Sequence, residues 1–284
     1  MILSFHPIIE ADQNIICAGR LPDDNDLQAI RRAEAVILPQ GCSEALYRMA
    51  RNNCPRVFPN LDVRFDYPGK NGQIRLFERL RIVHPETRTY PDLDAFGRDA
   101  APVEYPAVVK LDWGGQGETI FKADGPGELD AALRRVAAYE TSGQKGFLIQ
   151  QYIPSGQRAL RVVVIGTHVQ SYWRLQPADE KFGTSVVGGA VIDHQTDPDL
   201  QAVARKVVRS FCDRTGLALA GFDFIFSEHG DHADTAEPLM LEINYFFGRT
   251  GLGGSEEYYR QFEAEVDKWL AAAGLIRSNP NPGA

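Results

Sequence analysis

The segment PLMLEIN, residues 238–244, ends an apolar run with a carboxylate and an amide two positions apart. Side chains two residues apart on a strand lie on the same face, so Glu242 and Asn244 are expected to point the same way. Burying a carboxylate without a partner is costly, which indicates that Glu242 has either a charged partner or a chemical role. Four glycines follow within residues 248–254, where they would let the backbone approach a ligand beside Arg249.

A third polar side chain, Asp223, stands in the apolar run AGFDFIF one predicted strand earlier. If the two strands pair as a hairpin, Asp223, Glu242 and Asn244 converge on one patch of oxygen atoms. Hard cations such as Mg2+, or Mn2+ in its place, bind such oxygen ligands together with phosphate oxygens. The structural alternative is an ion pair between Glu242 and Arg249, with Asp223 capping a backbone group. Both interpretations stay open at this point.

A lysine and a glycine-rich loop occur together in VVKLDWGGQGETIF. Lys110 ends a predicted strand, and the loop after it contains Gly114, Gly115 and Gly117. Backbone N–H groups of such a loop can approach a phosphate while the ammonium group neutralises its charge. The spacing differs from that of a Walker loop, so a hairpin turn with a surface lysine is the alternative explanation.

The segment FLIQQYIP is typical of a buried strand that Pro154 stops. A chain segment that leaves a sheet between two lobes is a natural hinge, and its peptide groups could read the edge of an adenine. The residues of this predicted hinge are Gln150, Gln151, Tyr152 and Ile153.

Three cations follow the hinge, namely Arg161 in LRVVV, Arg174 in SYWRL and Lys181 in EKFG. On neighbouring strands the two arginines could line one face of a sheet, where a triphosphate would suit them. The alternative for each of them is a side chain that faces solvent.

The elements that position these residues begin with an alternation of strand-like and helix-like segments. Strands are predicted at 1–7, 14–20, 35–41 and 55–59, and helices at 24–34 and 43–53. This alternation predicts a small parallel sheet covered by helices. Apolar residues near helical spacing predict one further helix over 72–82.

The remaining chain divides into two more units and a tail. Residues 1–100 form the N-terminal α/β lobe with its connecting helix, and residues 101–153 form a second unit of three strands and a helix. Residues 154–277 contain antiparallel hairpins and two helices, which favours the α+β class, and residues 278–284 are expected to be disordered.

Composition excludes several classes of function. The 284 residues carry a net charge of −8 with a pI near 5.3, which argues against a broad surface for nucleic acid or anionic membranes. No apolar run is long enough to cross a bilayer and no secretion leader is visible, so a cytoplasmic location is expected. The four cysteines lack C-x-x-C spacing, which predicts reduced thiols and not a disulfide frame or a zinc site.

The order of these motifs resembles the ATP-grasp superfamily, in particular the amide-forming ligases that include the glutathione synthetases and the ribosomal-protein glutamate ligases. The resemblance spans about residues 70–270 and rests on YPGKNGQIRLFERLRIVHPET, PAVVKLDWGGQGETIF, LIQQYIP, LRVVVIG, GFDFIF and LEINYFFGRTGL. It implies an ATP-grasp fold of mixed α+β and α/β character, with 101–153 as the lid and 154–277 as the catalytic unit.

Carried over by position, the resemblance implies how a nucleotide would be held. Lys70 would be the first lysine to contact the nucleotide, and Lys110 would meet its α- and β-phosphates. Residues 149–153 would hold the adenine.

The resemblance also implies the catalytic groups. Arg161 and Arg174 would face the phosphates or an acyl phosphate, and Arg249 would lie near the acceptor substrate. The implied magnesium ligands are Asp223, Glu242 and Asn244.

The implied reaction joins a carboxylate to an amine, with small molecules or peptides as substrates, and releases ADP and phosphate from ATP through an acyl phosphate. Similar ligases are commonly dimers or tetramers, so a homo-oligomer is expected. Gln151 stands where related ligases often carry glutamate, and Ala159 replaces a common acidic residue. These departures leave two alternatives, a nucleotide-binding regulatory protein without turnover and a small-molecule kinase.

Overall fold

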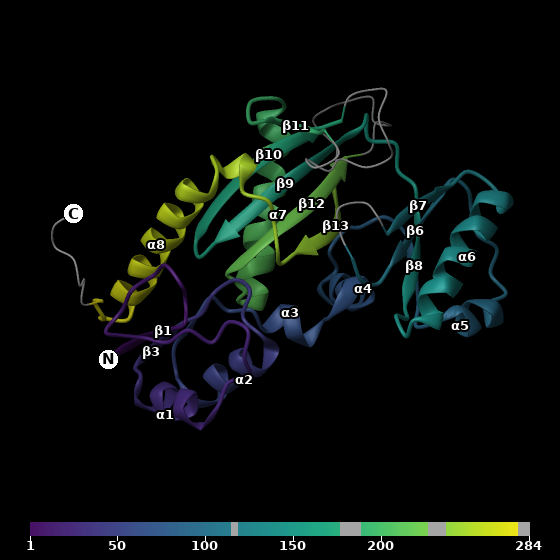
Figure 1. Ribbon diagram of the computed structural model, residues 1–284. Coiled ribbons are helices and arrows are strands. Elements are labelled where there is room, and N and C mark those ends of the chain that lie inside the picture. Colours follow the sequence, from purple (N-terminus) through teal and green to yellow (C-terminus); the bar gives the residue numbers. More distant parts are fainter. Residues whose placement is uncertain (115–118, 177–188, 227–236, 278–284) are drawn as a thin grey trace.

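A computed structural model describes residues 1–114, 119–176, 189–226 and 237–277. Its strands form three sheets, one in each of three units. Figure 1 shows the N-terminal lobe below a central sheet, and a smaller unit set apart on one side. The mixed α+β and α/β class predicted from the sequence is confirmed.

The N-terminal lobe is built on a parallel sheet in the order β2-β1-β3-β4. Its elements are β1 (Ile2–Ser4), β2 (Gln13–Asn14), α1 (Asp24–Arg32), β3 (Ala35–Ile37), α2 (Glu44–Asn53), β4 (Val57–Phe58), α3 (Asp62–Asp66) and α4 (Gly69–Leu80). The strand predicted over 14–20 was wrong beyond Asn14, because the chain turns there and Gly19 takes a left-handed φ of 79°. The other predicted strands and helices of this lobe are present.

The smaller unit holds an antiparallel sheet in the order β5-β8-β6-β7. Its elements are β5 (Thr87–Tyr90), α5 (Leu93–Arg98), β6 (Ala107–Leu111), β7 (Ile120–Ala123), α6 (Pro126–Thr141) and β8 (Phe147–Gln151). The sequence reading missed β5, a four-residue strand between two prolines that pairs with β8. The sheet therefore includes residues before 101, and we propose that this unit begins near residue 87.

The central unit is a five-stranded antiparallel sheet in the order β11-β10-β9-β12-β13. Its elements are β9 (Arg158–Ile165), β10 (His168–Leu175), β11 (Val191–Asp193), α7 (Pro198–Thr215), β12 (Leu219–Phe226), β13 (Pro238–Asn244), the 3-10 helix η2 (Thr250–Leu252) and α8 (Ser255–Ala272). Both predicted hairpins are present, as β9 with β10 and β12 with β13.

The molecule has three sheets but two hydrophobic cores among the described residues. One core joins the N-terminal lobe to the central sheet, and its aromatic contacts include Phe58 against Phe262 of α8, with ring centroids 5.5 Å apart. The smaller unit has a core of its own. Leu148 of β8 packs in the first core, whereas its neighbours Phe147 and Ile149 belong to the second, so the smaller unit contacts the rest of the molecule through this strand. Helix α4 lies between it and the central sheet in Figure 1.

Two further expectations concern the chain as a whole. In the described ranges no helix is both long and apolar enough to cross a membrane. The four cysteines are free thiols, three of them buried and Cys212 half-buried. The predicted disordered tail lies outside the described residues.

Candidate active site

Asp223 occupies the centre of a buried polar cluster on the central sheet. In the strand register it lies opposite Glu242 of β13 on one side and opposite Arg161 of β9 on the other. Directly opposed residues of antiparallel strands project from the same face. The pairing therefore gathers these charges on one face.

Four hydrogen bonds or ion pairs converge on the Asp223 carboxylate. Its Oδ1 accepts from Arg161 Nε at 2.5 Å and from Arg174 Nη2 at 2.8 Å. Its Oδ2 accepts from Arg161 Nη2 at 3.0 Å and from Asn244 Nδ2 at 3.0 Å. A carboxylate offers about four lone-pair positions, so these donors occupy all of them.

The electrostatics of the cluster are set by burial and by paired charge. Burial alone would raise the pKa of Asp223, but the charges and hydrogen bonds of Arg161 and Arg174 outweigh it and lower the pKa to about 2. The two arginine side chains are only 7% and 12% exposed. The alternatives of solvent-facing arginines and of a backbone-capping Asp223 are therefore wrong.

The same cluster retains unused bonding capacity. Arg174 Nε is buried without a hydrogen-bond partner in the described residues. Glu242 is half-buried and forms no ion pair in that part of the chain, so the alternative pair with Arg249 is not present there. A donor without an acceptor beside a carboxylate without a cation is suited to a metal-bound anion.

Lys110 approaches this cluster from the smaller unit. Its ammonium donates to Gln150 Oε1 at 2.7 Å, and the Gln150 amide donates in turn to Thr87 Oγ1 at 2.9 Å. Burial lowers the pKa of Lys110 to about 8, with Glu242 and Asp223 opposing the shift and Lys70 adding to it. Lys110 is therefore within electrostatic reach of both carboxylates. Gln150 positions this lysine by its side chain.

Lys70 joins the site from the first turn of α4. Its ammonium donates to the Gly114 carbonyl at 3.0 Å, and the Asp112 carboxylate accepts the Asn71 N–H at 2.6 Å. Gly69 has a φ of 70°, and a methyl group there would lie 2.4 Å from Asp112 Oδ2. Only glycine fits that contact, which fastens α4 to the loop after β6.

Gln73, which the sequence reading missed, holds the strand that carries Glu242 and Asn244. Its amide donates to the Ile243 carbonyl at 2.9 Å and its oxygen accepts the Ile243 N–H at 2.7 Å. Ile243 is the residue between the two proposed metal ligands, so Gln73 fixes the peptide to which both are attached. A signal existed, because Gln73 precedes Phe77 by one helical turn on the apolar face of the predicted helix.

If Glu242 and Asn244 hold Mg2+, Gln73→Met is expected to weaken Mg2+ binding by roughly 10- to 100-fold, the usual effect of losing a group that orients metal ligands. Two buried backbone groups would also lose their partner, at a cost of about 1–3 kcal/mol each. Calorimetric titration with Mg2+ and urea unfolding measure the two effects. Gln201→Met is the matched control, because Gln201 is a buried glutamine that bonds Ser171, His194 and Thr196 instead. An equal loss of Mg2+ affinity in both variants would remove the positioning role.

The hinge segment is only partly available to a base. The Gln151 N–H donates to the Glu86 carbonyl at 2.8 Å and the Tyr152 N–H donates to the Pro106 carbonyl at 3.2 Å. The N–H groups of Gln151 and Tyr152 are therefore engaged within the protein, and the contact between the peptide groups of this segment and an adenine stays a prediction. In the described part of the chain the Ile153 N–H makes no backbone hydrogen bond, so it is the donor that we propose for the base.

Arg249 borders a cavity of about 570 Å³. Its guanidinium stacks over the rings of Tyr258 and Tyr259, at 4.3 and 4.5 Å from their centroids. The cavity is lined by Gln40, Phe246, Phe247, Gly248, Arg249, Thr250, Gly254 and Ser255.

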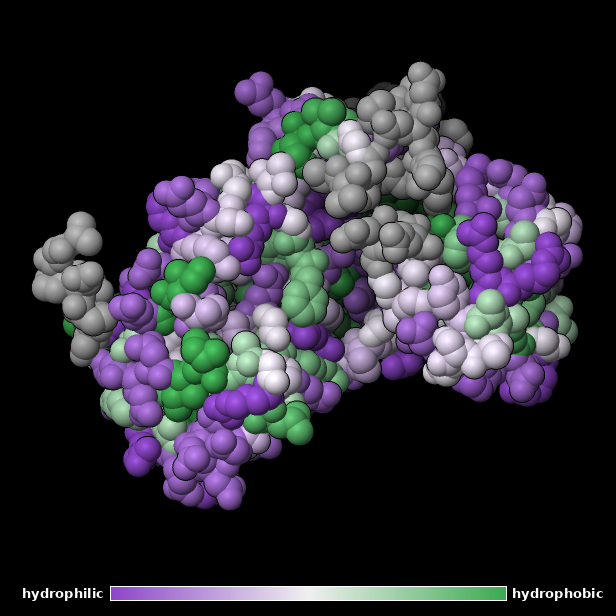
Figure 2. Space-filling model, viewed as in Figure 1, coloured by the Kyte–Doolittle hydropathy of each residue, from purple (hydrophilic) through white to green (hydrophobic). Residues whose placement is uncertain are grey.

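The cavity and the cluster are neighbours. A methyl group at Gly221 would lie 3.1 Å from the Arg161 side chain and 3.3 Å from Phe247 Cβ, so these two side chains flank one point on β12. Figure 2 shows the surface hollowed between the central sheet and the smaller unit. Gly251 was expected to let the backbone approach a ligand, but it makes room for a side chain instead. A methyl group there would lie 2.2 Å from the Tyr172 ring.

The donor set fits a hard cation in part. Glu242 and the Asn244 side-chain oxygen are oxygen ligands of the kind that Mg2+ prefers, whereas Asp223 would have to exchange an arginine to join them. No group of three or more His, Cys, Asp or Glu side chains that could hold a metal occurs in the described ranges. Three predicted site residues lie outside them, namely Gly115, Gly117 and Lys181.

A family model for the RimK-like ATP-grasp domain matches residues 73–259. The chain belongs to the RimK-like ATP-grasp family, whose members are enzymes. The matched range includes Lys110, Arg161, Asp223, Glu242 and Asn244. The family resemblance seen in the sequence is thereby confirmed.

Solved structures share the fold of this RimK-like ATP-grasp protein. An ADP complex of PurK, N5-carboxyaminoimidazole ribonucleotide synthetase, has a TM-score of 0.62 at 13% identity, covering 98% of this chain and 71% of that one. A RimK-domain ATP-grasp protein from Sphaerobacter thermophilus has a TM-score of 0.56 at 17% identity, covering 82% and 79%. D-alanine–D-alanine ligase from Bacillus anthracis has a TM-score of 0.59 at 12% identity, covering 89% and 84%. Such distant identities support the fold alone, and a comparison with curated proteins finds no match.

Proposed function

We propose that this protein is a cytoplasmic, ATP- and Mg2+-dependent ligase that joins a carboxylate to an amine through an acyl phosphate. The observation that carries the proposal is the buried cluster of Asp223, Arg161 and Arg174 beside Glu242, with buried Lys110 of the smaller unit within electrostatic reach of both carboxylates. Cations suited to phosphates and oxygens suited to a metal thus face one another. This is the arrangement that phosphoryl transfer needs.

In this proposal the smaller unit is the lid over ATP. Lys110 and Lys70 neutralise the phosphates, and the Ile153 N–H contacts the base. The lid has its own core and is fastened to α4 through Asp112 and Gly69. Its closure would exclude water from a reactive acyl phosphate.

The central sheet supplies the reacting end. A substrate carboxylate attacks the γ-phosphorus of ATP, ADP leaves, and an amine then attacks the acyl carbon and displaces phosphate. Bound Mg2+ would neutralise charge on the transferred phosphoryl group, with Glu242, Asn244 and Asp223 as its protein ligands. Arg161 and Arg174, released in part from Asp223, would stabilise the oxygens that gain charge in each step.

An ADP-release screen tests this function. Purified protein with ATP and Mg2+ is incubated with pooled carboxylates and amines, and ADP, phosphate and products are measured. Release that requires one carboxylate and one amine supports the ligase. ATP binding without release supports the regulatory alternative, and a stable phosphoester with no free phosphate supports the kinase.

Lys110 gives the site a pH dependence with a definite sign. Its pKa in the fold, about 8, is below its ordinary 10.5, so the unfolded chain binds more protons between these values and the free energy of unfolding rises with pH there. A phosphate bound beside Lys110 favours the charged form. We therefore expect an ATP analogue to bind with uptake of about one proton near pH 9.

Calorimetry in two buffers of different ionisation enthalpy measures that uptake. Lys110→Met is expected to abolish it and to weaken binding. Lys145→Met is the control, because Lys145 belongs to the same unit, is exposed and pairs with Asp92 at 3.8 Å. Proton uptake that persists in Lys110→Met would assign it to another group.

A further inference from the structure

Arg64 of α3 is a half-buried cation without a carboxylate partner in the described residues. Its guanidinium lies between the rings of Phe65 and Phe246, at 4.7 and 4.8 Å from their centroids, and Nη1 donates to the Gln40 carbonyl at 2.9 Å. Burial lowers the pKa of Arg64, and the charge of Glu44, which is itself paired with Arg48 at 3.4 Å, opposes this only in part. A partly desolvated charge that lacks a counter-ion usually indicates a partner still to be bound.

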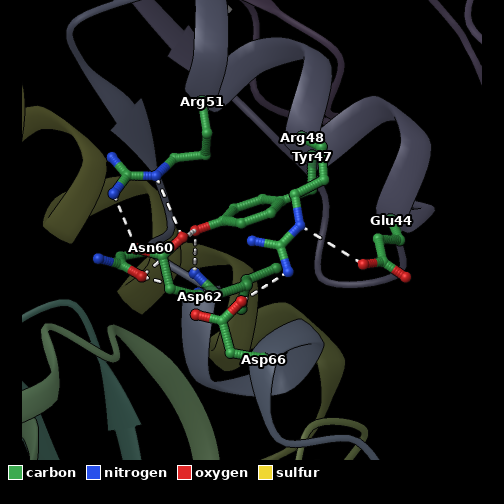
Figure 3. A network of polar contacts seen from close by, with 8 residues as sticks. Glu44, Tyr47, Arg48, Arg51, Asn60, Asp62 and Asp66 are labelled. Carbon is green, nitrogen blue, oxygen red and sulfur yellow. Dashed lines mark hydrogen bonds and ion pairs between the residues drawn. The ribbon is translucent and has the colours of Figure 1, made fainter.

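The acids nearest to Arg64 in the chain are already paired. Asp66 accepts from Arg48 at 2.6 Å, and Asp62 accepts from Arg51 at 2.7 Å and from the Tyr47 hydroxyl at 2.9 Å. Figure 3 shows this network between α2 and α3, with both carboxylates turned toward α2. Arg64 instead contacts Phe246, which follows β13. The local sequence therefore provides acids, but the fold directs them to other arginines.

The position of Arg64 relates it to the cavity. Two residues that it contacts, Gln40 and Phe246, line the cavity of about 570 Å³. None of the lining residues is acidic, and one of them is Arg249, which also has no ion pair among the described residues. In a chain of net charge −8, Arg249 on the lining and Arg64 in contact with two lining residues make this cavity locally cationic.

We propose that Arg64 binds a carboxylate of the substrate that occupies this cavity, separate from the carboxylate that is phosphorylated. The planar guanidinium fork suits a carboxylate held in two hydrogen bonds, and the flanking rings fix its plane. The cavity extends to Phe247 beside Arg161, so one molecule could contact both Arg64 and the reacting end. This inference rests on the proposed function, because it takes the bound molecule to be a substrate of the ligase. The substrate class is then a molecule that carries a carboxylate in addition to the one that is phosphorylated.

Equilibrium dialysis with labelled succinate, at fixed ionic strength and without ATP, tests the site directly. We expect wild-type protein to bind succinate at least about tenfold more tightly than the neutral succinamide, because a charge-assisted pair contributes that much. Arg64→Met is expected to lose about tenfold or more of the succinate affinity, and Arg64→Lys about threefold, since it keeps the charge and loses the fork.

Arg48→Met is the matched control. Arg48 also stacks on Phe65, with its Cζ 5.8 Å from the ring centroid, but it has Asp66 and Glu44 as counter-ions. Its removal should leave succinate binding unchanged. Far-ultraviolet circular dichroism establishes whether each variant is folded. If Arg64→Met does not fold, the succinate affinity of Arg64→Lys tests the proposal.

The proposal is overturned if the wild type and the folded Arg64 variant bind succinate with equal affinity. It is also overturned if the wild type binds no succinate up to about 50 mM, or if Arg48→Met loses as much succinate affinity as the Arg64 variant. Labelled inorganic phosphate bound more tightly than succinate would replace the carboxylate class by a phosphate. Because dialysis requires no turnover, this inference and the ligase proposal fail separately.

Discussion

Glu242→Gln is expected to lower ADP release by at least about a hundredfold while leaving the fold intact. The substitution keeps the size of the side chain and removes the carboxylate charge that we assign to the metal. Glu242 forms no ion pair in the described residues, and Lys110, whose charge it supports from a distance, keeps its hydrogen bond to Gln150. Initial rates of ADP release over a Mg2+ titration measure the loss of activity, and a thermal melt shows whether the fold is intact.

Glu256→Gln provides the control for this experiment. Glu256 lies exposed in the first turn of α8, away from the cluster on the central sheet. The control should keep the wild-type rate and Mg2+ dependence. If Glu242→Gln turns over like the wild type, the metal assignment fails and with it the proposed mechanism.

Asp223→Ala is expected to have the largest effect on stability. Asp223 neutralises Arg161 and Arg174, so its removal would leave two buried guanidinium groups without a counter-ion. Breaking a buried ion pair in this way costs about 3–5 kcal/mol. Urea unfolding measures the change.

Two comparisons make this prediction specific. Asp66→Ala breaks an ion pair with Arg48 in which the Asp66 side chain is 50% exposed, and it should cost about 1 kcal/mol or less. Adding Arg161→Met and Arg174→Met to Asp223→Ala should recover part of the loss, because the unpaired charges are then gone. A loss as small as that of Asp66→Ala would mean that the cluster is open to water.

The Asp223 cluster also predicts how stability depends on acid. The pKa of Asp223 is about 2 in the fold against an ordinary 3.8, so the unfolded chain binds the proton more readily. The stabilisation from this group is complete above about pH 4 and is lost as the pH falls through 2. The Asp223→Ala variant should lack this part of the acid dependence.

The predictions that succeeded relied on short-range patterns. Period-two spacing places Glu242 and Asn244 on one face, and the hairpin that brings Asp223 opposite Glu242 follows from two adjacent strands. The placement of Lys110 at the end of a strand before a glycine loop also followed from the local chain. Helical periodicity gave α4, although it left the role of Gln73 unnoticed.

The partners that the sequence left undecided are distant along the chain. The Gln150 side chain holds Lys110, 40 residues earlier. Asp223 pairs with Arg161, 62 residues earlier, and not with the backbone group that was the alternative. Strand register sets these partners, and the residues of one strand alone do not specify its register against a distant one.

The sequence by itself determined the family, the order in which the charged and polar residues follow one another along the strands, and the residue types suited to ATP and a metal. Only the tertiary structure decided which charges neutralise one another, because counter-ion choice depends on distances between elements far apart in the chain. It left Glu242 free of an ion pair in the described residues, surrounded Asp223 with donors, and turned Arg64 away from the acids beside it.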